Sequence, residues 1–301
     1  MHSTNELPDE AFVHEPAGEL PPFWQESCYF VAHRADRPGD VLILNVISMP
    51  SREVFDSYFM TRIDGVLRFQ RFTRRYDGDR RGTFAGPVRV EVTRPYEEIQ
   101  LAGPGLSLTW TARTRAHLLP AGSMTADGRL VWQQHHVIQS GWFNGVHTVN
   151  GLARPVRRWW GQRDHSWGVR DHARCPMWMW LAIQLGDGML GMWHWEHADG
   201  SPAYSQGCFA PVGKGDPIAV TAFSHDLAWV GDEALAGTVE VTLADGRHVR
   251  VHGSGTWNAR YGRRGGGQHH LAVVTDDGRT GTAIYEITGS GHHHFFPGRR
   301  R

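Results

Sequence analysis

The densest group of chemically unlike residues is Gly161–Asp171, which reads GQRDHSWGVRD. It holds two arginines, two aspartates, a histidine and a serine around one tryptophan, Trp167. Further tryptophans, Trp159, Trp160 and Trp178, lie on either side in the sequence. Charged groups are costly in an apolar setting unless they are paired, so the pattern predicts an ion-paired polar network in a largely buried place. Such a network serves either catalysis or architecture.

Asp164 and Asp171 are candidate proton donors. Adding water to an alkene, or cyclising a polyene, needs an acid that protonates carbon and an apolar pocket around the cation. A carboxylic acid whose pKa is raised by burial can supply that proton. In the architectural alternative, Asp164 pairs with Arg170, or Asp171 with Arg163, and locks the junction between two domains. Two arginines against two aspartates leave no uncompensated acid, which favours architecture.

His165 is a candidate general acid or base, because imidazole titrates near neutral pH. In catalysis a neighbouring carboxylate would orient the ring, whereas a structural His165 would hydrogen-bond across the junction. The adjacent Ser166 does not indicate a serine hydrolase. The nucleophile elbow Gly-x-Ser-x-Gly would need a glycine where Asp164 stands.

A second dense group is Met192–His197, which reads MWHWEH. In a β-strand Trp193 and Trp195 point to one side, and His194 and Glu196 point to the other. His194 and Glu196 are candidates for an acid–base pair in a ligand pocket. They can equally form an ion pair on the outer face of a barrel, and the sequence leaves both interpretations open.

Large apolar side chains surround both groups. Tryptophans at every second position are first of all core and barrel-lining residues. With methionines they also make a cavity for a flat or polyene-like ligand, and indole faces stabilise cations. The candidate substrate-binding residues are Trp167, Trp178, Trp180, Trp193, Trp195 and Met179, and the candidate structural ion-pair partners are Arg163 and Arg170.

Composition limits the partners. The 301 residues include 31 basic and 31 acidic side chains, and this balance argues against nucleic acid or an anionic membrane surface as main partner. No uninterrupted apolar run of about 18 residues predicts a membrane span. Three scattered cysteines and an N-terminus without signal-peptide layout predict a reduced, cytoplasmic setting. The 19 histidines show no established metal-ligand spacing, so neither a metal nor an organic cofactor is expected.

Strand-like segments separated by turn signals fill the chain. Leu106–Leu118 alternates as a half-buried strand should, and Asp-Gly turns predict hairpins at Ala244–Arg247 and Thr275–Arg279. Glu53–Arg62 fits either a strand or a short helix, and no long amphipathic helix is predicted. The pattern indicates an all-β, antiparallel protein, and its length predicts two barrels, residues 1–160 and 161–301, with the boundary between 150 and 180.

Gly161–Asp171 resembles the signature of a bacterial family related to carotenoid 1,2-hydratase and AttH-like proteins. Trp24–Phe30, WQESCYF, and Gln139–Gly141, QSG, also fit, so the resemblance covers most of the chain. It implies two lipocalin-like antiparallel β-barrels packed side by side, with a hydrophobic ligand pocket. Members and relatives of this family include hydratases of isoprenoid double bonds, Diels–Alder-type pericyclases and proteins with no known reaction, so the resemblance implies fold more than chemistry.

We therefore expect a protein that binds a hydrophobic small molecule of isoprenoid, steroid or polyketide type. The leading hypothesis is a cofactor-free hydro-lyase or cyclase/isomerase whose acid–base groups come from Asp164, His165, Asp171, His194 and Glu196. The alternative is a non-catalytic carrier, and a metal-dependent hydrolase or oxygenase is a third option. An enzyme should place a carboxylate or histidine in its apolar pocket, whereas a carrier should line it with apolar groups alone. The substrate and the oligomeric state, a homodimer included, stay open.

Overall fold

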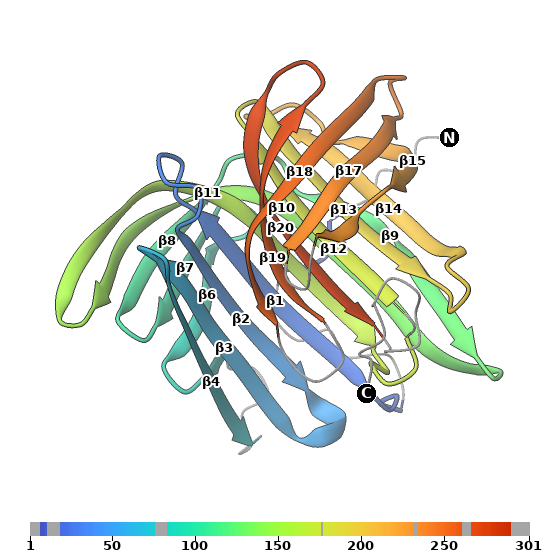
Figure 1. The fold of residues 1–301 in the computed structure, drawn as a ribbon. Coiled ribbons are helices and arrows are strands. Elements are labelled where there is room, and N and C mark those ends of the chain that lie inside the picture. The colour runs from blue at the N-terminus through green and yellow to red at the C-terminus, as the bar shows by residue number, and fades with distance from the viewer. Residues whose placement is uncertain are drawn as a thin grey trace. The chain divides into compact units, whose positions relative to one another are not determined.

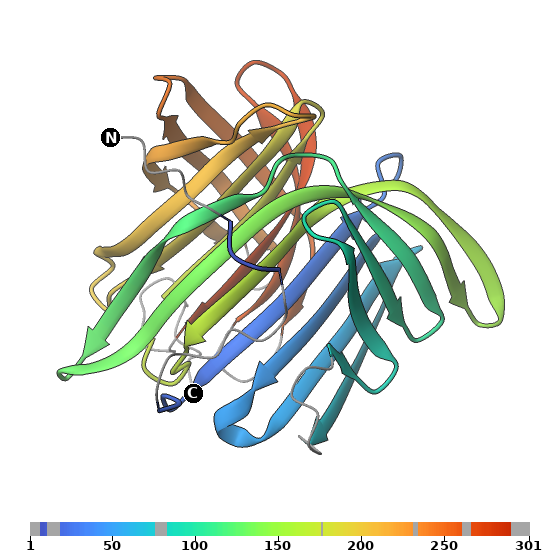
Figure 2. The same ribbon diagram turned by 180° about the vertical axis from the view of Figure 1, so that it is seen from behind.

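The computed structural model describes residues 7–10, 19–75, 83–175, 177–230, 234–260 and 266–289. Strands dominate this part of the chain, and its one short helical element is the 3₁₀ turn η1 (Pro50–Arg52). The strands form two antiparallel sheets, each curved into a barrel (Figures 1 and 2). The predicted all-β fold with two barrels is confirmed. Among the described residues, no helix has the length and apolar character needed to cross a membrane.

The first barrel is an 11-stranded sheet in which β9 (His117–Ala126) pairs with β10 at the side of the main path. Along that path the strands lie in the order β4 (Val66–Arg75), β3 (Val54–Ile63), β2 (Val41–Met49), β1 (Trp24–His33), β11 (Leu152–Val169), β10 (Arg129–Val149), β8 (Leu106–Ala112), β7 (Glu98–Gly103), β6 (Val88–Arg94) and β5 (Phe84–Ala85).

Side chains, rather than a backbone ladder, bridge the two ends of this path. The Ser57 hydroxyl donates to the Ala85 carbonyl at 2.9 Å, and Arg74 Nε donates to the Phe84 carbonyl at 2.8 Å. These bonds join β3 and β4 to β5, so the first barrel is nearly closed.

The second barrel is a nine-stranded sheet closed by backbone pairing of β15 with β17. Its strands lie in the order β15 (Ile218–His225), β14 (Pro202–Pro211), β13 (Gly188–Glu196), β12 (Met177–Leu185), β20 (Thr280–Gly289), β19 (Gly267–Thr275), β18 (His248–Arg260), β17 (Ala234–Leu243) and β16 (Ala228–Val230). The two predicted Asp-Gly turns join β17 to β18 and β19 to β20, with Gly246 and Gly278 at positive φ.

Contacts divide the chain into two compact units. Unit 1 comprises Met1–Ala121 and Gln134–Arg170, and unit 2 comprises Gly122–Gln133 and Asp171–Arg301. This division differs from a simple cut after residue 160, because residues 122–133 group with unit 2 and residues 161–170 group with unit 1. The polar motif therefore belongs almost wholly to unit 1.

Two segments take forms that the sequence left open or obscured. The ambiguous Glu53–Arg62 is the strand β3. The strand β11 runs from Leu152 to Val169, so most of the motif lies inside a central strand. Residues 161–169 are buried on both faces of the sheet, which hides the alternation of polar and apolar residues that normally reveals a strand.

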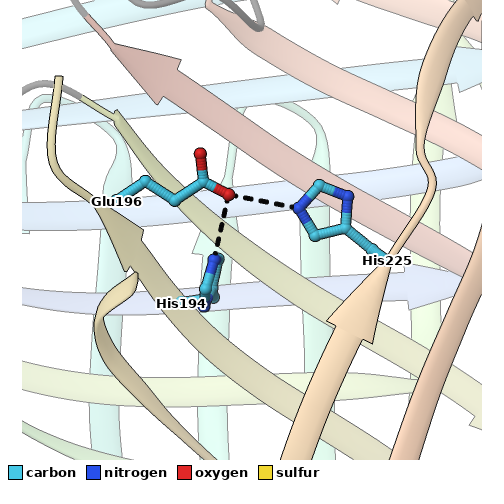
Figure 3. Close-up of side chains that lie close together, drawn as sticks. All are labelled: His194, Glu196 and His225. Atoms are coloured by element: carbon cyan, nitrogen blue, oxygen red, sulfur yellow. Dashed lines mark hydrogen bonds and ion pairs between the residues drawn. The ribbon is translucent and has the colours of Figure 1, made fainter. Parts of the chain in front are cut away.

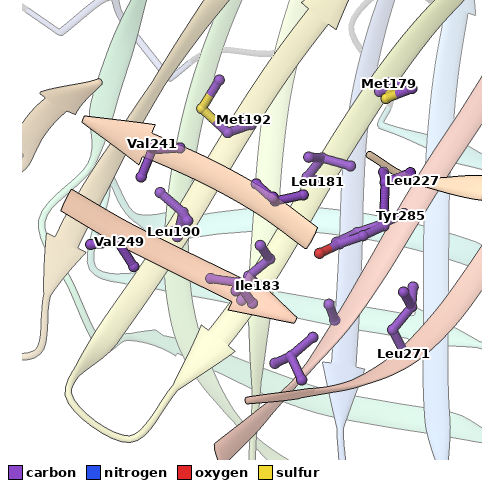
Figure 4. Packing of buried hydrophobic residues seen from close by; sticks show 14 of the residues in the cluster. Met179, Leu181, Ile183, Leu190, Met192, Leu227, Val241, Val249, Leu271 and Tyr285 are labelled. Carbon is purple, nitrogen blue, oxygen red and sulfur yellow. The ribbon is translucent and has the colours of Figure 1, made fainter. Parts of the chain in front are cut away.

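Apolar clusters occupy the inner faces of both barrels. In unit 2 the alternating residues Met177, Met179, Leu181 and Ile183 of β12 join Met192 and others in one buried cluster (Figure 4). In unit 1 a corresponding cluster contains Cys28, Phe30, Leu44, Phe59, Trp110 and Phe143, among others. Membership of these clusters identifies which face of each strand is the inner one.

Two glycines of the signature stretches are register partners. Gly141 of β10 lies opposite Gly161 of β11. A Cβ atom on Gly141 would lie 1.8 Å from Trp110 Nε1, and one on Gly161 would lie 1.8 Å from the Val31 carbonyl oxygen. Neither site accepts a side chain, so the close approach of β1, β10, β11 and Trp110 requires glycine at both positions.

Candidate functional site

The strand β11 divides the motif between two faces of the first barrel. Arg163 and His165 lie opposite Phe30 and Cys28 of β1, which belong to the inner apolar cluster. Side chains alternate along a strand, so Arg163, His165 and Trp167 point inward. Asp164 and Ser166 therefore point to the opposite face. Residues that look like one site in the sequence belong to two.

Two buried ion pairs lie on the inner face. His165 Nε2 is 2.6 Å from Glu26 Oε1, and neither side chain is more than 3% exposed. Arg163 pairs with Glu10 of the N-terminal segment and also donates through Nη2 to Gln139 Oε1 at 2.8 Å. Each carboxylate thus has its own cationic or potentially cationic partner. Charge-assisted bonds of this kind are what make such burial tolerable.

Trp167 packs beside His165. Its indole is 5.4 Å from the His165 ring and stacks on His135, also at 5.4 Å, with an interplanar angle of 9°. Trp167 shares a small buried cluster with Trp24 and Val169. One side of the His165–Glu26 pair is therefore an aromatic and apolar wall.

The other polar residues of the motif have local partners. Asp164 Oδ2 is 3.2 Å from His136 Nε2, and Arg170 Nη2 donates to the Ser166 hydroxyl at 2.7 Å. Asp171 accepts from the Ala173 amide at 3.1 Å and lies 3.4 Å from Arg174 Nη1, so it stabilises a turn after the strand.

These contacts differ from the pairings considered in the sequence. Arg163 binds Glu10 instead of Asp171, and Asp164 binds His136 instead of Arg170. The strand explains the first difference, because the inward direction of Arg163 takes it to a partner from the N-terminal segment. Sequence proximity within the motif does not reveal that partner.

The candidates on β12 and β13 also divide between two faces. Met179 lies opposite His194 in the register and belongs to the inner apolar cluster, so His194 and Glu196 point inward. The four tryptophans lie on the opposite face of this sheet. Trp178 stacks on Trp193 with ring centroids 4.9 Å apart.

The outward tryptophans are nevertheless buried. Trp195 stacks on Tyr204 at 4.3 Å, and Trp132 lies 6.1 Å from Trp195 and 6.2 Å from Trp178. Trp180 is only 1% exposed. These tryptophans, predicted to bind substrate, therefore lie on the face opposite the inner apolar cluster of the second barrel, whose inner face carries methionines and aliphatic side chains.

Glu196 is shared by two histidines in the second barrel (Figure 3). Its Oε1 atom is 3.2 Å from His194 Nε2 and 3.3 Å from Nε2 of His225, the last residue of β15. His194 Nδ1 is 2.6 Å from the hydroxyl of Ser205 on β14. Burial raises the pKa of Glu196, but hydrogen bonds from both histidines outweigh this and lower it to about 2. Glu196 is therefore a carboxylate at neutral pH, which suits orientation of the rings and not proton donation.

The first barrel has a pocket of about 550 Å³. Its lining includes Phe59 and Thr61 from β3, Arg68 from β4 and His147 from β10. Burial, together with Arg68 and Arg154, lowers the pKa of His147, which favours a neutral ring. The pocket therefore combines aromatic surface with a fixed cation and a neutral imidazole.

Sequence reasoning missed Glu10, Glu26 and His225. Glu26 lies 139 positions from His165, and His225 lies 29 positions from Glu196, so local spacing could not join them. Glu26 had a usable signal, since it is the one acidic residue in the stretch WQESCYF that matched the family resemblance. His225 had none of comparable strength.

Comparisons agree with this fold. A family model described as "Domain of unknown function (DUF7064)" matches residues 8–290. A solved structure described as an AttH from Nitrosomonas europaea has a TM-score of 0.64 and 13% identity, over 92% of this chain and 98% of that chain. Kievitone hydratase from Nectria haematococca has a TM-score of 0.56 and 10% identity, over 89% of each chain.

A further solved structure is similar. CghA with Sch210972 has a TM-score of 0.54 and 12% identity, over 92% of this chain and 91% of that chain. No curated protein matches the chain. Identities of this size show the fold and leave the reaction to the geometry of the site.

Proposed function

This chain belongs to the DUF7064 family, and we propose that it binds a hydrophobic small molecule of isoprenoid, steroid or polyketide type in its first barrel and catalyses cofactor-free acid–base chemistry on it, either hydration/dehydration or cyclisation. The observation that carries the proposal is the buried His165–Glu26 pair on the inner face of that barrel. This pair brings together the titratable ring of His165, which was a candidate in the sequence, and the Glu26 carboxylate, which orients that ring. The aromatic ring of Trp167 lies beside the pair.

The pocket of the first barrel supports the binding step. Phe59 lines it and belongs to the same apolar cluster as Phe30. In the register Phe59 lies opposite Leu44, Leu44 opposite Phe30, and Phe30 opposite Arg163. This row spans three strand spacings, about 14 Å, and His165 lies two residues beyond it. An elongated apolar molecule that enters at the pocket and displaces part of this cluster could therefore reach His165.

The chemistry follows the requirements of alkene hydration. Protonated His165 would transfer its proton to an alkene carbon, water would attack the resulting cation, and the proton lost by that water would return to His165. Glu26 would hold the ring and stabilise its positive charge before transfer, as a carboxylate does for a catalytic histidine. Trp167, 5.4 Å from the His165 ring, would stabilise the substrate cation through its face.

The structural relatives support the same class of chemistry. One is a hydratase, kievitone hydratase, and CghA was solved with Sch210972. Their low identity transfers no residue role to this chain. Three free thiols, Cys28, Cys175 and Cys208, support placing this activity in the cytoplasm.

A non-catalytic carrier is the second candidate. The Arg163–Glu10 pair favours it, because a satisfied buried pair stabilises a barrel without doing chemistry. The pocket favours an enzyme, because its lining includes Thr61, Arg68 and His147 as well as apolar groups.

Mass spectrometry of the compound released from denatured, purified protein tests both candidates. Turnover of that compound is then measured for His165→Gln and Glu26→Gln, with His136→Gln as the matched control. His136 also pairs with a carboxylate but lies on the opposite face of the same sheet. We expect His165→Gln to lower kcat at least about 100-fold and to leave binding within a few-fold.

Asp164→Asn, Asp171→Asn and His136→Gln should retain turnover within a few-fold, because their side chains lie outside the inner face. Full turnover by both His165→Gln and Glu26→Gln would rule out the assigned acid–base pair. A wild-type protein that releases its compound unchanged under all conditions would support the carrier.

A further inference from the structure

We propose that His194, Glu196 and His225 form a binding site for one divalent transition-metal ion in the second barrel. One ligand atom from each of the three residues lies within 4.8 Å of the other two. The site lies in unit 2 and is independent of the acid–base chemistry proposed for unit 1.

The spacing of the ligand atoms fits a metal ion. Two histidine nitrogens lie 3.2 and 3.3 Å from the same oxygen, Glu196 Oε1. Tetrahedral coordination with metal–ligand bonds of about 2.0–2.1 Å places neighbouring ligand atoms about 3.3 Å apart. The Glu196 edges of such a tetrahedron are therefore already present.

The strands explain why these side chains converge. His194 and Glu196 are two residues apart on β13 and so share its inner face, while His225 ends β15, two strands away across β14. Figure 3 shows His225 directed at Glu196 from that strand. Ser205 of β14 lies opposite His194 and contacts its Nδ1 atom at 2.6 Å. A metal-binding histidine commonly donates a hydrogen bond from the N–H of its second ring nitrogen to such a partner, which fixes the ring.

A metal ion would take the place of the hydrogen bond between His225 Nε2 and Glu196. The Leu227 amide can only donate, and it donates to His225 Nδ1 at 3.3 Å. A neutral His225 ring therefore carries its proton on Nε2 and donates it to Glu196. Binding through Nε2 would move that proton to Nδ1 and release the long Leu227 bond. The carboxylate and two neutral rings would then hold the cation with little change in side-chain position.

The donor set indicates the class of metal. Two imidazole nitrogens and one carboxylate oxygen suit Zn²⁺ or Fe²⁺, and three protein ligands leave positions open for water or another oxygen ligand. The Phe223 ring lies 4.8 Å from the His194 ring and packs against the inner apolar cluster. An oxygen-bearing apolar molecule is the ligand that such surroundings favour.

The same geometry explains why spacing alone did not predict the site. His-Glu-x-x-His motifs place two ligands on one face of a helix, four residues apart. On a strand the equivalent spacing is two residues, as in His194 and Glu196, and the third ligand, His225, comes from β15, which is separated from β13 by β14 in the sheet. The pattern His-x-Glu is too short to indicate a metal without the fold.

Metal loading of the untagged full chain tests the proposal. The native run His292–His294 lies outside the described residues and can itself bind metal, so it is replaced by serines in every protein compared. Chelator-treated protein is loaded with Zn²⁺, or with Fe²⁺ without oxygen, passed through gel filtration and analysed by elemental mass spectrometry. We expect about one ion per chain and, for Co²⁺, visible absorption bands that report its coordination geometry.

Variants then assign the ligands. His225→Gln and Glu196→Gln should weaken binding more than about 100-fold, and Ser205→Ala about 10-fold, as expected for removal of a ligand and of a supporting partner. His252→Gln is the matched control, because His252 pairs with Asp276 at 2.5 Å in the same unit but is exposed. It should bind like the wild type.

Two outcomes overturn the site. One is wild-type protein that retains less than about a tenth of an ion per chain after gel filtration. The other is His225→Gln protein that binds with wild-type affinity. His225 is 14% exposed, more than either of its partners, so this variant is the least disruptive of the three ligand substitutions. Circular dichroism and Tm verify its fold before loading.

Discussion

The inner faces of the two barrels carry polar groups of different kinds. In the first barrel each carboxylate has its own partner, with Glu10 on Arg163 and Glu26 on His165. In the second barrel one carboxylate, Glu196, is shared by two imidazoles. An arginine carries a permanent charge, whereas an imidazole can be neutral, protonated or bound to a metal.

The two barrels therefore differ in whether the partner of the buried carboxylate has a permanent charge, as arginine has, or a charge that changes with protonation or metal binding, as histidine has. Arg163 and Glu10 are each 2% exposed, so removal of either leaves an uncompensated buried ion. Glu196 contacts two imidazole rings, each of which can be neutral, protonated or bound to a metal ion. In the part of the chain that the structure describes, the first barrel therefore combines a permanent ion pair with a titratable one, whereas the inner carboxylate Glu196 of the second barrel contacts two titratable rings.

The aromatic residues show a second contrast. Trp167 lies on the inner face of the first barrel beside His165, whereas Trp178 and Trp193 stack on the outer face of the second. A tryptophan that is close to a charged motif in the sequence therefore does not have to point into the barrel. Its register against a neighbouring strand decides which face it covers.

We expect the largest loss of stability when the buried Arg163–Glu10 ion pair of the first barrel is broken. Arg163→Met should lower the free energy of unfolding by about 3–5 kcal/mol, because Glu10 is left buried without its cation. Urea unfolding followed by fluorescence and circular dichroism measures the loss. The double variant with Glu10→Leu should recover most of it, since no unpaired charge remains.

Arg247→Ala is the control in the second barrel. Its pair with Asp245 is exposed, so its removal should cost less than about 1 kcal/mol. A cost for Arg163→Met as small as that for Arg247→Ala would show that the inner pair does not hold the first barrel together. The contrast between permanent and adjustable charge would then fail.

A smaller effect tests the strand contacts that set the position of the motif. Gly161→Ala and Gly141→Ala should each destabilise the protein by about 1–3 kcal/mol, because a methyl group at either site overlaps β1 or Trp110. Thermal unfolding measured by calorimetry gives the change in Tm.

Gly186→Ala, in the second barrel, is the matched control because a Cβ atom there has no neighbour within 4 Å. An unchanged Tm for both Gly141→Ala and Gly161→Ala would mean that β11 can move away from β1, and β10 away from Trp110, at little cost. The placement of His165 beside Glu26 would then not depend on these glycines.

Much of the fold was predictable because strand periodicity and turns are local signals. The first part of the predicted strand Leu106–Leu118 is β8, which ends at Ala112, and its last two residues begin β9; the Asp-Gly turn at Ala244–Arg247 forms the β17–β18 hairpin. β11 was harder, because both of its faces are buried around the motif and polar residues lie on each. Polar residues therefore alternate with other polar residues along this part of β11. The alternation of apolar and polar residues that normally identifies a strand is absent there.

The candidate site was predictable only in part. His165, His194 and Glu196 stand out by type, and the strand interpretation of MWHWEH already separated its tryptophans from His194 and Glu196. Their partners Glu26 and His225 lie on strands that are far away in the sequence, and only the order and register of the strands in each sheet bring them close. Pairing two arginines with two aspartates inside the motif was wrong because it assumed that sequence neighbours share a face.

The smallest expected effect concerns His147, the neutral imidazole in the pocket of the first barrel. Burial, Arg68 and Arg154 lower its pKa below the ordinary value of 6.5 in the folded protein. As pH falls below 6.5 the unfolded chain takes up this proton before the folded protein does, so stability decreases. The His147→Leu variant lacks this proton uptake and should show a weaker decrease in Tm between pH 7 and pH 5, by about 2 °C.

His147 thus tests an acid-sensitive group of the pocket separately from the buried ion pairs. Calorimetry of wild type and His147→Leu at matched ionic strength measures the difference. Equal slopes for wild type and His147→Leu would show that protonation of His147 costs the folded protein nothing. The pocket would then accept a charged imidazole as readily as a neutral one, and an anionic ligand group would become as suitable there as an apolar one.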